Sequence, residues 1–592
     1  MGNNSGFIKQ ALSLITYKKT KDVKDFYIPE VNEKGNEPKR EYVGNSTKTN
    51  SGNTKKVKKY RGIKKPVLLD HSLKHENQRD ADDSIVSPNI ESNKSYLEQK
   101  FNYPANKDII IREFTVASKY KAFIAYLDGM VDRITINNFI LRPLLIRNQL
   151  NDENLGCQLD FILQSVIETN QAKKVTDPDE AIYEILVGNT LLYVDGCDFY
   201  LTNETKGYDK RAVDKPLTEG VVMGAQEAFN ETLRTSVTLI RKQIKNNNLT
   251  TEFLKIGERN KNLCAVMYIR GLTNPAIVDE VKRRINGIKT DMVIGDGMLE
   301  QFIEDNPGSI FPTVLTTERP DRASAHIMEG KVAILVEGSP FAKIVPVTLP
   351  SLMHSPEDSF LKWQFGSFIR IIRFMSAFIA IMLPGLYVAA TNFHQEMIPT
   401  DLLIAIAKAK ENVPFPTIVE VLLMEFSFEL IREAGIRIPG IIGNTLGIIG
   451  ALILGQAAVQ ANIVSPVLII IVALTGLGNF AIPNFGLAFG ARILRFIFIF
   501  AGAFLGFYGV AVAAVIVTAY QMNIKSFGVP YYSTVSPKVR KSMDVLFRWP
   551  LWMQELRPDT VNALDIRRQP EISRKWTQEA PNIRKDTEDN ND

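Results

Sequence analysis

Four stretches of about 20 residues without a charged side chain constrain this chain more than any other feature. They cover residues 374–393, 441–461, 463–483 and 496–520. At 1.5 Å per residue, a helix of this length crosses a hydrocarbon core of about 30 Å. We therefore predict four membrane spans, although the 592 residues are on average only 45% apolar and 23% charged.

A fifth segment, residues 417–437, lies between proline-containing turns and has the limits of a helix, but it is charged. Its apolar residues favour insertion by about 3 to 6 kcal/mol, whereas Glu425, Glu429 and Arg432 oppose insertion by about 7 to 10 kcal/mol. At 100° per residue these three side chains and Glu433 share one face. We expect an amphipathic helix that lies at the interface or turns this polar face towards protein or water.

Flanking positive charge predicts the orientation of the spans. The basic residues before the first span and after the last are Lys362, Arg370, Arg373, Lys525, Lys538, Arg540 and Lys541. They place both ends of the membrane region in the cytoplasm, as four spans require. Arg492 and Arg495 disagree, because four spans put them outside. A five-span alternative puts this pair inside but exports the C-terminal basic cluster.

The N-terminal region is polar and basic. Residues 1–80 contain 18 Lys and Arg against 9 Asp and Glu, whereas the whole chain has a net charge of only +5. Such a segment buries too little apolar surface to offset its ordering entropy, so residues 1–104 are predicted to be a disordered tail. The run Lys55–Lys65 is read as a solvated linker, with attraction to anionic lipid or nucleic acid as the alternative.

Residues 105–365 have a globular pattern and contain a short repeat. Residues 188–196 (GNTLLYVDG) and 330–338 (GKVAILVEG) share a frame in which Gly precedes an apolar strand and an acid–Gly turn follows it. Residues 227–246 are expected to form one amphipathic helix and residues 263–269 a strand. We predict a mixed α/β (α+β) cytoplasmic domain of two related subdomains.

Enzymatic signatures are absent. The sequence has no phosphate-binding loop or zinc-protease motif, and its five His and three Cys show no metal-ligand spacing. We therefore expect neither catalysis nor a cofactor or metal. His394 beside Glu396 is read as an interfacial polar loop, and Thr317–Asp321 as a structural ion-paired loop.

Polar side chains also occur inside the 441–461 stretch. Asn444, Gln456 and Gln460 lie there among several glycines, which usually serve helix packing but also suit the lining of a hydrated pore. Gln456 and Gln460 share a face at i, i+4, and Val459 beside them is a candidate constriction. These four residues are our candidate pore-lining set.

Ordered sequence motifs indicate a family. The chain resembles the A subunit of the GerA-type spore germinant receptors of endospore-forming bacteria from about residue 223 through the membrane region. The matching motifs include TERPD (317–321), VEGSPF (336–341), SPED (355–358), LPGLYVA (383–389), FHQEMIPT (393–400), PFP (414–416), FELIREAGIRIP (428–439), GQAAVQA (455–461), IVSP (463–466) and FGVPY (527–531).

The resemblance implies a subunit of a nutrient receptor in the inner spore membrane. It implies a permease-like B subunit and a lipoprotein C subunit as partners, and a homo-oligomer in contact with membrane lipid that forms an ion-conducting path. Nucleic acid is not expected as a partner. A secondary transporter and a non-conducting scaffold for the sensor remain as alternatives.

The predicted organisation has four parts. Residues 1–104 form the tail, 105–365 the cytoplasmic domain, 366–523 an all-α polytopic membrane domain, and 524–592 a cytoplasmic C-terminal tail.

Overall fold

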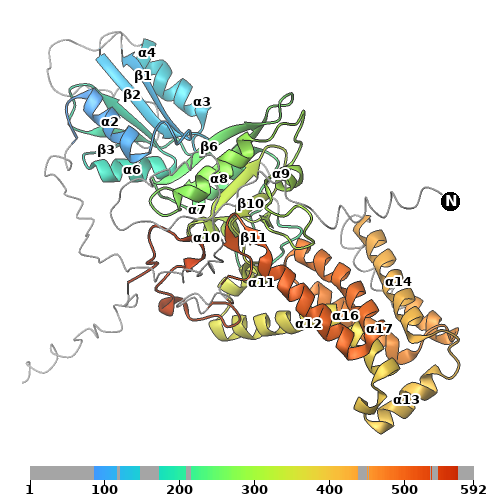
Figure 1. The fold of residues 1–592 in the computed structure, drawn as a ribbon. Coiled ribbons are helices and arrows are strands. Elements are labelled where there is room, and N and C mark those ends of the chain that lie inside the picture. Colours follow the sequence, from blue (N-terminus) through green and yellow to red (C-terminus); the bar gives the residue numbers. More distant parts are fainter. Residues whose placement is uncertain are drawn as a thin grey trace, which may run out of the picture. The chain divides into compact units, whose positions relative to one another are not determined.

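The computed structural model describes residues 86–116, 120–146, 172–207, 215–437, 450, 453–533, 535 and 544–570 (Figure 1). The basic run and most of the predicted disordered tail therefore lie outside the described residues. The tail prediction is wrong at its end, because residues 90–100 form a helix, and Leu97 and Phe101 are fully buried in a core. Two compact units emerge from the fold, the first half of the α/β region and the remainder of the chain. Each is described by itself.

The first unit contains a five-stranded antiparallel sheet. Its strands are β1 (Ile109–Val116), β2 (Tyr120–Leu127), β3 (Ala172–Val175), β4 (Thr190–Val194) and β5 (Tyr200–Asn203), in the order β1-β2-β4-β5-β3. The accompanying helices are α2 (Ile90–Lys100), α3 (Arg133–Thr135), the π-helix η1 (Ile136–Leu141), α4 (Arg142–Ile146) and α6 (Pro178–Val187). Apolar residues of the sheet and of these helices form one buried core.

The second unit begins with another sheet of the same kind. Its strands are β6 (Leu249–Ile256), β7 (Asn262–Ile269), β8 (Leu315–Thr317), β9 (Val332–Val336) and β10 (Ala342–Val345), in the order β6-β7-β9-β10-β8. Its helices are α7 (Leu233–Gln243), α8 (Pro275–Asn286), α9 (Asp296–Ile303), α10 (Pro320–Ile327) and α11 (Leu349–Met353). The two sheets therefore share one strand order.

The nine-residue sequence repeat forms equivalent hairpins, β4–β5 and β9–β10. The glycines at both ends of each repeat have positive φ, which favours glycine: Gly188, Gly196, Gly330 and Gly338. The turn acids also act alike, since Asp195 accepts from the Ile90 amide and Glu337 from the Leu233 amide, each at 3.0 Å. Each carboxylate thus caps the first helix of its own sheet, so the acid–Gly turn fixes a helix start in both halves.

The expected helix over residues 227–246 is shorter in the structure, where α7 begins at Leu233. The preceding residues are held by other partners. The Phe229 amide donates to the Glu318 carbonyl at 2.8 Å, and the Asn230 carbonyl accepts from the Ser236 hydroxyl at 3.0 Å. These tertiary contacts take precedence over the helical periodicity of the segment.

Apolar helices follow the second sheet. They are α12 (Trp363–Phe393), η3 (Gln395–Met397), α13 (Thr400–Lys410), α14 (Thr417–Arg437), a helix over residues 453–460, α16 (Pro466–Phe480) and α17 (Phe485–Asn523). Within the described residues, α12 and α17 are long and apolar enough to cross a membrane, and α16 is a shorter apolar helix. The short strands β11 (Lys525–Ser526) and β12 (Val529–Pro530) and the 3-10 turns η2 (Pro356–Ser359), η4 (Leu551–Met553) and η5 (Asp559–Val561) complete the chain.

The element α17 is a hairpin of two helices that reverses at Gly506, whose φ of 60° and ψ of −146° are not helical. The contacts of Phe311 with both ends of α17 demonstrate the reversal. Its ring centroid lies 6.2 Å from that of Tyr520, and a Cβ placed on Gly490 would lie 4.0 Å from the same ring. In a straight helix residues 490 and 520 would be about 45 Å apart, so both ends of α17 meet the loop around Phe311.

This geometry differs from the predicted single span 496–520. That uncharged stretch contains the reversal, and the two antiparallel arms are residues 485–505 and 507–523. The prediction missed the turn because one glycine between long apolar runs does not reveal its φ. Contact between the two arms supports the hairpin, since a Cβ on Gly509 would lie 2.2 Å from the Ala501 carbonyl, which belongs to the first arm.

Candidate functional site: buried ion pairs among the apolar helices

Glu425 of α14 lies at the centre of the helical region and is fully buried. Its carboxylate accepts a hydrogen bond from the Arg495 guanidinium of the first α17 arm. Arg495 is 3% exposed, and its Nε donates to the Ala380 carbonyl of α12 at 2.9 Å. One buried ion pair therefore joins three helices.

A second pair lies one helical turn further along. Glu429 accepts from Arg492 Nη1 at 2.7 Å. The Arg492 guanidinium also lies over the Phe489 ring, 3.7 Å from its centroid, an arrangement that favours a cation. This pair is more open than the first, because the Glu429 side chain is 25% exposed.

Arg432 extends the row towards the end of α16. Its guanidinium lies 4.6 Å from the centroid of Phe480. With the Asn479 amide oriented to satisfy its neighbours, the amide oxygen accepts from Arg432 at 2.8 and 3.1 Å, and the nitrogen donates to the Ala488 carbonyl at 3.1 Å. Arg432 thus has polar and aromatic partners in place of water.

Near the start of α14, Glu420 is 1% exposed and forms the other end of the row. Its carboxylate accepts from the Ser465 amide at 3.0 Å and lies 3.3 Å from Lys410 Nζ. The nearby Thr417 hydroxyl donates to Asn392 at 3.0 Å. We call Glu420, Glu425, Glu429 and Arg432, with Lys410, Asn479, Arg492 and Arg495, the ion-pair ladder.

The ladder contacts fix the relative directions of the helices. The starts of α14 and α16 meet at Glu420 and Ser465, and their ends meet at Arg432 and Asn479, so the two helices run parallel. The first α17 arm is antiparallel to α14, because Arg492 and Arg495 meet Glu429 and Glu425 in reverse order. The end of α14 and the start of α16 therefore lie at opposite ends of the ladder.

Three residues of the predicted polar face, Glu425, Glu429 and Arg432, lie together in the ladder, whereas Glu433 is exposed. The sequence interpretation missed their partners. Arg492 and Arg495 entered it only as a conflict in the orientation of the spans. The available signal was the matched spacing of two acids at i, i+4 and two arginines at i, i+3 in otherwise apolar helices.

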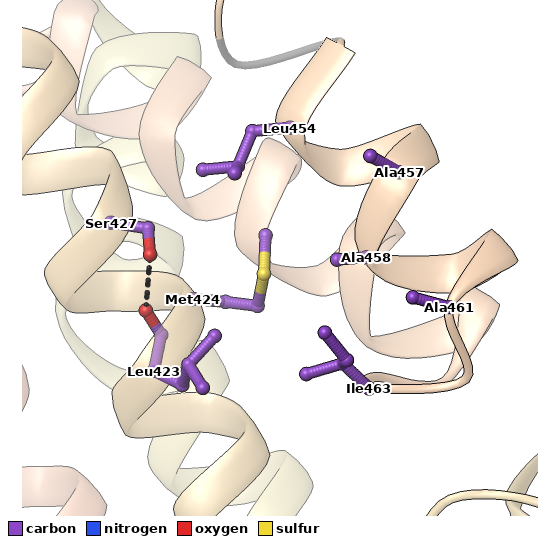
Figure 2. Close-up of a pocket in the computed structure, with 8 residues that line it drawn as sticks. All are labelled: Leu423, Met424, Ser427, Leu454, Ala457, Ala458, Ala461 and Ile463. Atoms are coloured by element: carbon purple, nitrogen blue, oxygen red, sulfur yellow. Dashed lines mark hydrogen bonds between the residues drawn. The ribbon is translucent and has the colours of Figure 1, made fainter.

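The candidate pore-lining residues lie on the helix over residues 453–460. Gln456 and Gln460 are exposed and Val459 is half-buried, while Asn444 lies outside the described residues. The other face of this helix lines a cavity of about 280 Å³ against α14 (Figure 2). The cavity is lined by Leu423, Met424, Ser427, Leu454, Ala457, Ala458, Ala461 and Ile463. The glutamines thus point away from α14.

The Thr317–Asp321 motif forms an ion-paired cluster in the second sheet region. Arg319 is fully buried, and its guanidinium binds Asp321 in bidentate fashion at 3.0 and 2.7 Å. It also donates to the Glu219 and Ala225 carbonyls, and the Glu318 carboxylate accepts from the Glu219 amide at 2.7 Å. The motif holds the segment before α7 in place.

A second buried cluster joins this region to the start of α12. Asp358 accepts from Arg370 at 3.0 Å and from Arg373 at 2.8 Å. His354 Nε2 lies 2.8 Å from the Val545 carbonyl, and burial lowers the pKa of His354 to about 4. His354 is therefore neutral at pH 7. In the described part of the chain, no group of three His, Cys, Asp or Glu residues is arranged to hold a metal.

Taken together, two α/β sheets of one topology followed by apolar helices with internal ion pairs define a protein that joins an α/β region to helices of membrane-spanning length. Residues 95–560 match the family model described as Bacillus/Clostridium GerA spore germination protein. The chain belongs to this GerA family, which confirms the resemblance seen in the motifs.

Individual relatives agree with this assignment. Spore germination protein KA of Bacillus subtilis is 39% identical over 488 residues, 82% of this chain and 89% of that protein. Spore germination protein GerLA of Bacillus cereus is 36% identical over 460 residues, 77% and 93% of the two chains. A solved structure, the N-terminal domain of the A subunit of the Bacillus megaterium spore germinant receptor GerK3, is 30% identical over 44% of this chain and 96% of that chain, with a TM-score of 0.36.

Proposed function

We propose that this chain is the A subunit of a nutrient germinant receptor in the inner spore membrane. It acts with a permease-like B subunit and a lipoprotein C subunit, and its α/β domain faces the cytoplasm. Family membership over residues 95–560 is the observation that carries this proposal. The names of the relatives place them in spore germination.

Within the receptor, the A subunit oligomerises around an ion-conducting path. The exposed face of the 453–460 helix supports this role, because Gln456 and Gln460 are polar, uncharged and open to a neighbouring copy or to water. Weakly polar rings suit conduction, whereas charged rings hold an ion and bulky aliphatic rings expel water. Val459 forms the constriction.

The ion-pair ladder is the element that couples the path to the rest of the subunit. It ties α14, which packs beside the 453–460 helix, to the α17 hairpin, whose two ends meet the loop around Phe311. A nutrient signal that moves the α/β region therefore displaces α14 through the hairpin. Such coupling needs an element that can adopt two arrangements. The two acids of α14 and the two arginines of α17 provide one, because each acid can exchange one arginine for the other.

Substitution at the constriction tests the conducting role. Val459→Ala should widen the path and release ions without nutrient, while Val459→Phe should block germination at unchanged protein level. A cysteine at Gln456 should react with an aqueous thiol reagent in assembled membranes. A cysteine at Ala458, which lines the apolar cavity and is 7% exposed, is the matched control and should react slowly.

Single-channel recording of the purified subunit separates the remaining roles. Currents that change with Val459→Ala support the channel. A silent protein whose Val459 variants germinate normally would leave a non-conducting scaffold, and solute uptake without channel currents would indicate a transporter.

A further inference from the structure

The C-terminal segment exposes a group of large apolar side chains outside the uncharged stretches. Leu551 and Met553 are each 56% exposed, Phe547 is 54% exposed, and Trp552 and Trp549 are 43% and 38% exposed. We call these five residues the aromatic patch. Two of the chain's four tryptophans lie in it.

Buried Arg548 holds the patch against the first turns of α12. The Arg548 backbone is held at both its polar groups. Its amide donates to the Ser367 hydroxyl at 3.0 Å, and that hydroxyl donates to the Arg548 carbonyl at 3.1 Å. The guanidinium donates to the Ser359 carbonyl at 3.0 Å and to the Leu361 carbonyl. Gly366 allows the approach, since a Cβ there would lie 3.1 Å from Arg548 Cδ.

The patch is thus fixed in position, with its apolar side chains turned outward. Exposed apolar groups of this size on an anchored backbone mark an interaction surface.

An exposed apolar stripe also runs along α12, from the level of the patch into the first uncharged stretch. It consists of Phe365, Phe368, Ile372, Met375 and Phe378, which are between 43% and 63% exposed. Their spacing of three or four residues places them on one face of the helix. Trp363, 40% exposed, stands at the start of this helix and adds a third tryptophan.

From this anchoring at the level of the first turns of α12 we infer that the aromatic patch docks on the lipid bilayer, in the interfacial layer beside the entry of that helix. Tryptophans collect at membrane–water interfaces because their rings are apolar and their N–H groups remain polar. Lys538, Arg540 and Lys541 lie shortly before the patch in the sequence and attract anionic headgroups. This inference rests on the membrane location given in the proposed function.

Docking at this place would connect the bilayer to the α/β region through the C-terminal segment. Beyond the patch, Arg557 donates to the Met328 carbonyl at 3.1 Å, and the Leu564 amide donates to the Leu272 carbonyl at 2.9 Å. One continuous segment therefore contacts the bilayer, the start of α12 and the second sheet region.

Depth-dependent quenching by brominated lipids tests the inference on the full-length chain in nanodiscs that contain phosphatidylglycerol. A variant that keeps only Trp552, with Trp363, Trp549 and Trp576 changed to Phe, reports on the patch. Two further variants lack all four tryptophans and carry Phe378→Trp in the α12 stripe or Phe302→Trp on α9. Phe302 is 50% exposed in the α/β region, which matches Trp552 in exposure.

Trp552 should be quenched at least two-fold more than the tryptophan at 302, and most strongly by bromine near the headgroup. If the tryptophan at 378 is quenched while Trp552 behaves like the one at 302, the patch does not bind lipid. The membrane location then survives. That result overturns the inference even if Trp552 emits at short wavelength, because another protein surface then covers it. If neither position 378 nor Trp552 is quenched, the membrane location itself is wrong.

Discussion

Glu425 and Arg495 form an ion pair whose stability contribution is sensitive to mutation, because both side chains are almost completely buried. Removal of one partner leaves an uncompensated charge, which costs about 3 to 5 kcal/mol. Glu425→Leu and Arg495→Leu should each lower stability by this amount, whereas the double variant should recover most of the loss. Thermal unfolding of the full-length protein in detergent measures all three.

Glu429 is the matched control for this experiment. It also pairs with an arginine, but its side chain is 25% exposed, so water partly compensates for a lost partner. Glu429→Leu should cost about 1 kcal/mol, leave the protein inserted and still impair germination. Equal losses at Glu425 and Glu429 would mean that burial does not set the energy of the pairs.

Glu304, at the end of α9, makes stability depend on pH. Burial and the nearby Glu300 raise its pKa from 4.5 to about 7, while the Thr313 hydroxyl and Lys343 oppose the shift and Asp305 adds to it. The folded protein therefore holds this proton more tightly than the unfolded chain, so stability should fall as pH rises from about 4.5 to about 7.

Glu304→Gln should remove this dependence and raise stability at pH 8 by about 1 kcal/mol, a value reduced for partial solvent exposure. Melting temperatures of both proteins between pH 5 and pH 8, about the range of the titration, provide the measurement. Parallel curves for the two proteins would assign the pH dependence to another group.

Among the elements of the fold, the α17 hairpin depends on Gly506 for its reversal. Its φ is 60°, and a Cβ there would lie 2.8 Å from the His394 ring. Gly506→Ala should lower stability by about 2 kcal/mol, because its φ and ψ lie in a region that is nearly restricted to glycine, where strain costs about 1 to 3 kcal/mol for other residues, and because the Cβ would meet the His394 ring. Thermal unfolding again gives the value.

Gly476 of α16 provides the control, since a Cβ there would meet only the Phe428 ring at 3.9 Å. Gly476→Ala should be neutral or stabilising by up to about 1 kcal/mol, as expected for a helix interior. A harmless Gly506→Ala variant would contradict a tight reversal at this position.

For the whole molecule, we propose from the helix directions a topology with more crossings than the four predicted from the uncharged stretches. In this proposal α12 leads outward, α14 returns, the 453–460 helix belongs to a connection that leads outward again, α16 returns, and the two α17 arms cross once each. Six crossings keep both ends on one side, in agreement with the basic residues at both ends. They also place Arg492 and Arg495 near the cytoplasmic side, which removes their conflict with the flanking charge.

Labelling with a membrane-impermeant thiol reagent tests this topology. Cysteines at Leu402 and Leu505, which are 49% and 57% exposed, should react only from the side opposite the α/β domain. A cysteine at Met522, 52% exposed, should react only from the side of that domain. Under the single span 496–520, a cysteine at Leu505 would lie within the bilayer and react from neither side.

The local sequence pattern was sufficient to predict structure at positions where a single residue type decides the local backbone geometry. The repeated glycines and turn acids indicated two hairpins, and ordered motifs identified the family, because both signals lie in consecutive residues. The polar face of α14 was visible for the same reason, since helical periodicity relates residues three or four positions apart.

Only the tertiary structure decided which groups meet across the chain. The partners of Glu425 and Glu429 lie 70 and 63 residues away on α17, and no local period relates positions at that distance. The reversal at Gly506 depends on a φ angle that neighbouring helices impose, and the start of α7 depends on contacts with Glu318 and Glu337. The sequence by itself determined the apolar helices and the repeated sheets, whereas long-range pairing of charges determined their directions.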